Sequence, residues 1–127
     1  MRKSAEATAI CPLFPATEVV FGRWTASILW TLQQGTSMRF TELQTAVPGV
    51  SPKVLTQRLR QLEADGLVTR TYYPEMPPRV EYGGTALADT LSPVFTALSN
   101  WSAAHLSDVL DARAQAAKSY VESLDAM

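Results

Sequence analysis

The chain has 127 residues, of which 46% are hydrophobic and 18% charged, a composition typical of a single globular domain and not of a disordered segment. One cysteine and one histidine exclude an internal disulfide framework and argue against metal sites and most catalytic triads. No apolar run approaches the roughly 20 residues that span a bilayer, and the polar N-terminus has no signal-peptide core, so we expect a cytoplasmic protein without membrane contact.

Charge is distributed unevenly, although the formal net charge is only −1. Residues 39–80 carry six basic and four acidic side chains, whereas residues 81–127 carry two basic and six acidic ones. A basic middle and an acidic C-terminal third are compatible with one surface that faces DNA and another that is turned away. Ordinary protein surfaces also show imbalances of this size, so charge alone does not indicate DNA binding.

The N-terminal third predicts a flexible arm, two helices and a short strand. Residues 1–10 are polar and form the predicted arm, and Cys11 opens the ordered domain, which we expect to reach residue 107. Residues 16–21 predict a short helix, and residues 24–34 predict a second one because their apolar side chains recur at helical spacing. Residues 39–40 predict a short strand.

Residues 41–66 have the pattern of a helix-turn-helix. Thr41 and Gln44 match a capping box, which predicts the start of a short helix that ends at Pro48. After a three-residue turn, serine at the N-cap and proline at the first helical position start a longer helix. Its apolar stripe and its closing glycine are Leu55, Leu59, Leu62 and Gly66.

A β-hairpin is predicted directly after the second of these helices. Residues 67–73 are rich in Val, Thr and Tyr and predict one strand, and residues 79–82 predict the returning strand. A proline-rich turn over residues 74–78 joins them. A hairpin in this position, here residues 67–84, is the wing of a winged helix-turn-helix, so we predict a mainly α fold with one small hairpin (α+β).

The remaining residues predict two more helices. Residues 85–107 form one helix, which Pro93 should kink, and residues 108–127 form a C-terminal helical extension. The apolar stripe of the first helix is either plain core or a dimer contact, and we predict the dimer contact. Its residues are Leu87, Leu91, Val94, Leu98 and Trp101.

The exposed face of the 51–65 helix predicts contact with DNA. Its long or hydrogen-bonding side chains read base edges in known complexes, arginine at guanine, glutamine at adenine and threonine at the thymine methyl group. The alternative is an ordinary solvated helix face, which the flanking helix and hairpin disfavour. The predicted DNA-binding residues here are Ser51, Lys53, Thr56, Gln57 and Arg60.

Three arginines outside this helix are further candidates. Arg39 and Arg79 belong to the predicted DNA-binding set, with Arg79 reaching the minor groove or phosphates from the wing. Pairing with Glu81 or Glu75 is the alternative for Arg79, and for Arg70 the two interpretations remain equally open.

Several segments between Cys11 and Trp101 carry a resemblance to one family, and the run from Pro48 to Leu67 is highly specific in combination. They are Cys11-Pro12, GRWT at 22–25, RFTEL at 39–43, PGVSPKVLTQRLR at 48–60, LEADGL at 62–67, Pro74, PPRVEY at 77–82 and Trp101. The chain resembles the HxlR family of winged helix-turn-helix regulators, within the MarR-like superfamily. This resemblance implies a homodimer with N- and C-terminal dimerisation helices that binds double-stranded DNA at a pseudo-palindromic operator and activates or represses nearby genes. Gly83-Gly84 departs from the family's usual Ser-Leu, which we expect to loosen the wing.

The signal that controls such a regulator is left open. The resemblance implies that Cys11 is a candidate sensor of oxidants or electrophiles, and the alternative is a small side chain packed near a dimer interface. The candidate effectors are an oxidant or electrophile and a small molecule. We expect no cofactor, no metal and no enzymatic activity, because the sequence has no phosphate loop, ligand cluster or nucleophile–base pair. The alternative function is a winged-helix module for protein contacts without DNA.

Overall fold

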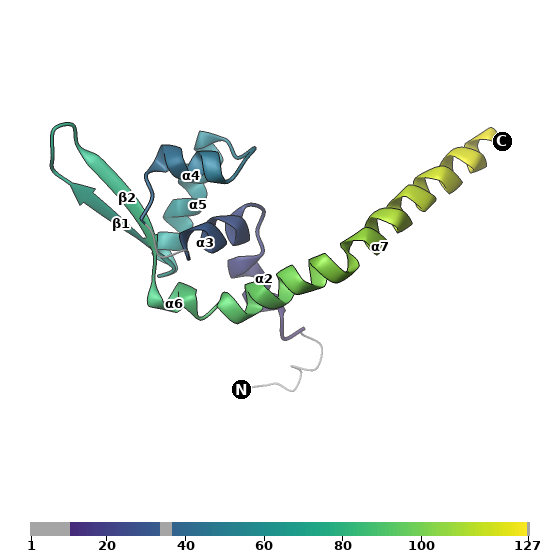
Figure 1. Cartoon of the computed structure of the whole chain (residues 1–127), viewed down its shortest axis with the longest axis horizontal. Coiled ribbons are helices and arrows are strands. Elements are labelled where there is room, and N and C mark those ends of the chain that lie inside the picture. The colour runs from purple at the N-terminus through teal and green to yellow at the C-terminus, as the bar shows by residue number, and fades with distance from the viewer. Residues whose placement is uncertain (1–10, 34–36, 127) are drawn as a thin grey trace. The chain divides into compact units, whose positions relative to one another are not determined.

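The computed structural model describes residues 11–33 and 37–126. This part of the chain contains α2 (Phe14–Val20), α3 (Thr25–Leu32), α4 (Phe40–Ala46), α5 (Pro52–Ala64), β1 (Val68–Tyr73), β2 (Arg79–Gly84), α6 (Ala86–Asp89) and α7 (Ser92–Asp125) (Figure 1). The predicted α+β winged helix is therefore confirmed. The predicted arm, residues 1–10, lies outside the described residues. The chain divides into two compact units, one that ends at Ser92 and one that begins at Pro93.

The core of the first unit consists of aliphatic side chains from its helices and β1. The predicted stripe of α5 is confirmed, since Leu55, Leu59 and Leu62 are each exposed by 2% or less. Burial of a leucine stabilises a fold by about 1.5–3 kcal/mol relative to leaving it exposed. Hydrophobic packing therefore holds α5 in place, although a helix of 13 residues is marginal in isolation. The largest fully buried side chains are Ile28, Leu29, Leu32, Leu43, Leu55 and Leu62.

The predicted turn between α4 and α5 depends on Gly49. This residue has a φ of +94°, and a Cβ atom there would lie 3.3 Å from Cη2 of Trp24. Trp24 itself has a φ of 78° and caps the N-terminus of α3, with the guanidinium carbon of Arg23 4.8 Å from its ring centroid. Both the left-handed backbone and the close approach of the indole favour glycine at this turn.

Helix α4 begins earlier than predicted, and the capping box assigned to Thr41 and Gln44 is wrong. Arg39 is the N-cap residue, and its backbone N–H donates to Oε1 of Glu42 at 2.8 Å. The side chain of Gln44 donates instead to the carbonyl of Val50 at 3.4 Å. The glutamate at the third helical position therefore supplies the cap that we assigned to a glutamine two residues later.

The strand predicted at residues 39–40 is also wrong. Met38 forms an isolated antiparallel bridge to Tyr82 of β2, with N···O distances of 2.9 and 2.7 Å. Its partner lies far along the sequence, so no local pattern around residue 38 could have located this pairing. The bridge fixes the base of the hairpin to the segment that leads into α4.

Both ends of α5 follow the prediction. The hydroxyl of Ser51 accepts a hydrogen bond from the backbone N–H of Val54 at 3.2 Å, and proline follows at the first helical position. At the other end Gly66 has a φ of +79° and donates to the carbonyl of Glu63 at 3.1 Å, while Leu67 donates to Leu62 at 2.9 Å. These two bonds form a Schellman motif, which ends the helix and turns the chain into β1.

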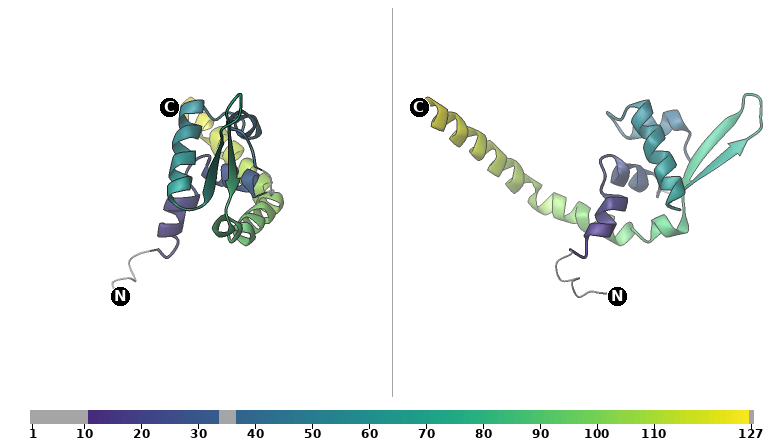
Figure 2. Two further views of the ribbon diagram at one scale, coloured as in Figure 1. Left: turned by 90° about the vertical axis from the view of Figure 1, so that its left-hand side faces the viewer. Right: turned by 180° about the vertical axis from the view of Figure 1, so that it is seen from behind.

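The hairpin extends beyond the helices of the first unit, as Figures 1 and 2 both show. β1 and β2 pair antiparallel from Val68 with Gly84 to Tyr73 with Arg79. The two glycines that we expected to loosen the wing lie inside β2, and a Cβ atom on Gly84 would come within 3.3 Å of the Leu32 carbonyl oxygen. Gly84 therefore allows the strand to pass close to the end of α3.

The C-terminal helices differ from the prediction. Residues 85–107 do not form one helix, because α6 ends at Asp89 and α7 begins at Ser92, and α7 then continues without a break through the predicted extension. Pro93 lies in the first turn of α7, where its missing N–H costs no intrahelical hydrogen bond, so it causes no kink. Among the described residues, none of the helices has the length and apolar character needed to cross a membrane.

Candidate nucleic-acid interface

The side of α5 opposite its buried leucines presents a row of polar side chains. Lys53, Gln57 and Arg60 are exposed, and their spacing of four and three residues places them above one another on one helix face. The first carboxylate along α5 is Glu63, near its C-terminal end. This face can therefore donate hydrogen bonds and attract phosphate along most of the length of the helix without repelling it.

Ser51 and Thr56 also lie on α5 or at its cap, but their hydroxyl groups are already used by the helix. The oxygen of Ser51 accepts from the backbone of Val54 at 3.2 Å, which leaves its hydroxyl hydrogen as a donor. The hydroxyl of Thr56 donates to the carbonyl of Pro52 at 2.8 Å, and the side chain is half-buried. Thr56 therefore offers a methyl group and an acceptor oxygen, and it is less accessible than its neighbours.

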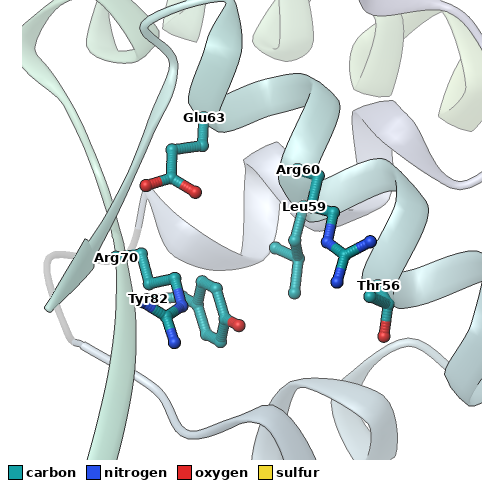
Figure 3. Close-up of a pocket in the computed structure, with 6 residues that line it drawn as sticks. All are labelled: Thr56, Leu59, Arg60, Glu63, Arg70 and Tyr82. Atoms are coloured by element: carbon teal, nitrogen blue, oxygen red, sulfur yellow. The ribbon is translucent and has the colours of Figure 1, made fainter. Parts of the chain in front are cut away.

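A groove of about 340 Å³ lies between α5 and the hairpin (Figure 3). Arg60 lies on the helix side of this groove, and Arg70 and Tyr82 lie on the hairpin side. Arg70 and Tyr82 are paired directly across the two strands, so their side chains share one face of the hairpin. The remaining residues of the groove are Thr56, Leu59 and Glu63.

Arg79 projects from the opposite face of the hairpin and is paired with carboxylates. Its Nη1 donates to Oε1 of Glu75 at 2.9 Å, and its Nε lies 2.9 Å from Oε2 of Glu81. The guanidinium carbon also lies 4.0 Å from the ring centroid of Tyr73, its cross-strand partner. Arg79 thus makes the carboxylate pairs that the sequence left as the alternative to a DNA contact.

Arg70 was not among the residues predicted to bind DNA, although the sequence carries a signal for it. If the loop spans residues 74–78, Tyr73 must pair with Arg79, and counting back along both strands pairs Arg70 with Tyr82. Alternation along a strand then puts Arg70 and Arg79 on opposite faces. Only the position of α5 decides which of these faces borders the predicted DNA-reading helix.

The other predicted residues lie apart from α5. Arg39 is exposed at the N-terminus of α4, and Cys11 is exposed ahead of α2. Among the predicted dimer residues, Leu87 is 55% exposed and Trp101 is 51% exposed, and Leu91 is half-buried. Dimerisation through these side chains remains a prediction. In the described part of the chain, no three His, Cys, Asp or Glu side chains form a cluster that could hold a metal ion.

The fold and the exposed face of α5 define a winged helix-turn-helix protein of the kind that binds DNA. The chain belongs to the HxlR-like helix-turn-helix family, whose model matches residues 19–109. It is therefore a DNA-binding transcription regulator and not an enzyme.

Individual relatives agree with this assignment. The uncharacterised helix-turn-helix regulator YtfH of Escherichia coli is 41% identical over 81% of this chain and 81% of its own length. The solved structure of the redox regulator HypR in its reduced form matches with a TM-score of 0.72 and 32% identity, over 80% of this chain and 99% of HypR. The reduced form of the regulator YodB from Bacillus subtilis matches with a TM-score of 0.65 and 32% identity, over 73% of this chain and 91% of YodB.

Proposed function

We propose that this regulator binds a pseudo-palindromic operator as a homodimer, with α5 of each subunit in the major groove. The observation that carries this proposal is the row formed by Lys53, Gln57 and Arg60, exposed along one side of α5 and free of carboxylates. An α-helix with its side chains is about 10–12 Å wide, which matches the roughly 12 Å width of the major groove.

The exposed side chains of α5 have different roles in this proposal. Arg60 and Gln57 contact base edges, because their side chains can form two parallel hydrogen bonds to guanine and adenine. Lys53 and Ser51 lie at the N-terminal end of α5 and contact phosphate, where the free backbone N–H groups of the helix also favour an anion. Thr56 contributes its methyl group.

Two arginines outside α5 complete the proposed contact set. Arg39 contacts phosphate from the N-terminus of α4, where it is exposed. Arg79 contacts phosphate from the wing only by exchanging its carboxylate partners Glu75 and Glu81, which hold it in the free protein. We therefore expect Arg79 to contribute less to affinity than Arg39.

The base-reading role is tested with the Arg60→Ala variant in a mobility-shift assay on the promoter region of the protein's own gene. We expect a loss of about 1–3 kcal/mol in binding free energy and a relaxed preference at one base pair of each half-site. Arg113→Ala, an exposed arginine on α7, removes the same charge and should leave binding unchanged. Equal effects of the two substitutions on base preference would contradict the placement of α5.

The phosphate role of Lys53 is tested by the salt dependence of binding. Lys53→Ala should weaken binding to all sequences alike and reduce the slope of log K against log salt by about 0.9 for each phosphate that the lysine neutralises. The matched control is Lys118→Ala on α7, which should leave the slope unchanged. An unchanged slope in Lys53→Ala would show that this lysine does not touch the backbone.

Exposed apolar side chains support the proposed homodimer. Val94, Leu98 and Trp101 of α7 are each more than 40% exposed in the single chain, which is unusual for large side chains at helical spacing unless a partner covers them. A two-fold dimer requires half-sites about 34–36 Å apart. Sedimentation should give twice the mass of the chain, and a monomer that binds a site without a repeat would refute the dimer.

An oxidant is the effector that we propose, sensed by Cys11. The side chain is exposed, and the similar structures include HypR, which is a redox regulator. Since each chain has one cysteine, a disulfide in a dimer could form only between subunits or with a small thiol. Diamide should change operator affinity of the wild type but not of Cys11→Ser, and an equal response in both proteins would exclude this cysteine.

A further inference from the structure

The groove between α5 and the hairpin is a polar site, and its hairpin side, formed by Arg70 and Tyr82, is not part of the proposed contact set. We propose that it seats one phosphate of the DNA backbone, with the guanidinium of Arg70 and the hydroxyl of Tyr82 as its hairpin ligands. This proposal rests on the proposed function, because it requires α5 to lie in the major groove.

The position of the groove on α5 points to the DNA backbone rather than to base edges. Lys53, Gln57 and Arg60 lie opposite the buried leucines, whereas Thr56 and Glu63 lie on the flank that faces the hairpin. When a helix fills the major groove, its flanks face the two phosphate backbones and only its central face points at the bases. In this placement, one of the two DNA backbones passes along the flank of α5 that faces the hairpin.

The charge of the groove favours an anion with a single negative charge. Two guanidinium groups and one carboxylate line it, from Arg60, Arg70 and Glu63. Within the described residues, the ion pairs involve Arg79 and His105 but not Arg70, so the Arg70 guanidinium can bind an external anion without breaking a pair. Arg79, on the other face of the same hairpin, would have to give up two carboxylates to do so.

The backbone of Tyr82 is hydrogen-bonded on both sides of β2. It pairs with Arg70 across the hairpin and exchanges two hydrogen bonds with Met38 on the other side. At the base of the hairpin, the hydroxyl of Thr85 donates to the carbonyl of Gly66 at 2.8 Å and ties β2 to the end of α5. The backbone that carries Tyr82 is therefore tied to its neighbouring segments, which limits the freedom of this wall of the groove and reduces the entropy lost on binding.

Glu63, near the C-terminal end of α5, limits where an anion can lie in the groove. Its carboxylate lies between α5 and the hairpin on the Arg70 side of the groove (Figure 3). A phosphate close to this carboxylate would be repelled, so the anion is confined to the part of the groove between Tyr82, Arg60 and Arg70. The proposal therefore predicts that loss of the Glu63 charge strengthens DNA binding.

The test measures operator affinity at several salt concentrations for four single variants. Arg70→Ala should lower affinity about tenfold, since a charge-assisted hydrogen bond is removed, and should reduce the salt slope by about 0.9 with no change in base preference. Arg70→Lys should retain the slope, and Tyr82→Phe should weaken binding without altering the slope. Glu63→Gln should raise affinity.

Other outcomes would overturn the proposal. An unchanged affinity and slope in Arg70→Ala would show that the groove takes no phosphate, and altered base preference would assign Arg70 to a base edge. A thermal stabilisation by inorganic phosphate that Arg70→Ala abolishes, without any effect on DNA affinity, would assign the groove to a free anion. If instead Arg60→Ala leaves base preference intact, the placement of α5 fails, and this result is distinguishable from a failure of the groove alone.

Discussion

Helices α5 and α7 carry the two halves of the proposed function, and they differ in how their apolar side chains are covered. α5 has 13 residues, and its leucines at 55, 59 and 62 are buried within the single chain. α7 has 34 residues and leaves most of its large apolar side chains exposed, namely Val94, Leu98, Trp101, Leu106, Leu110, Tyr120, Val121 and Leu124. Since a helix gains most of its stability from packing of an apolar face, α5 is stabilised within the single chain, whereas the exposed apolar side chains of α7 are those that the proposed homodimer would cover.

The largest expected effect is on the stability of the core that α5 helps to form. Leu55→Ala should lower the free energy of unfolding by about 2–5 kcal/mol, because it removes a fully buried side chain and leaves a cavity. Leu106→Ala removes the same atoms from a position 43% exposed on α7 and should cost much less at low protein concentration. Urea denaturation measures the free energy of unfolding of both variants. Equal losses at low protein concentration would show that the single chain packs Leu106 as tightly as Leu55.

The second expected effect is on association. Trp101→Ala should weaken the homodimer by about 2 kcal/mol or more, since aromatic residues at the centre of an interface contribute most to its affinity. Analytical ultracentrifugation over a range of concentrations measures this change. Tyr120→Ala alters an exposed aromatic residue of the same helix outside the predicted dimer face and serves as the control. A dimer that tolerates Trp101→Ala and not Tyr120→Ala would move the interface to the C-terminal half of α7.

The smallest expected effect concerns the cap of α5. Ser51→Ala should destabilise the protein by about 1 kcal/mol, because the N–H of Val54 loses its acceptor. Ser99→Ala, at an exposed position within α7, should be neutral or slightly stabilising because alanine is the better helix former. Thermal denaturation measures the stability of both variants. An equal response of the two serines would mean that the cap contributes nothing in this fold.

The sequence predicts the candidate DNA-contact face of α5, but it does not decide the roles of the hairpin arginines. The face of α5 could be predicted because helical periodicity assigns Lys53, Gln57 and Arg60 to one side once the leucines are assigned to the other. The carboxylate partners of Arg79 could be proposed but not chosen, since pairing across a hairpin and contact with DNA use the same guanidinium. Counting residues back from the loop assigns Arg70 to one face of the hairpin. The groove beside that face could not be predicted, because it depends on where α5 packs.

The helix-turn-helix was determined by the sequence itself because its signals are local. Ser51 and Gly66 mark the ends of α5 through hydrogen bonds and backbone angles that involve only neighbouring residues. Tertiary structure alone decided which distant segments the base of the hairpin and the end of α6 contact. The carbonyl of Ala88, at the end of α6, accepts a hydrogen bond from the side chain of Gln33, and Met38 pairs with Tyr82. These contacts join residues that are far apart in the chain, so no local propensity encodes them.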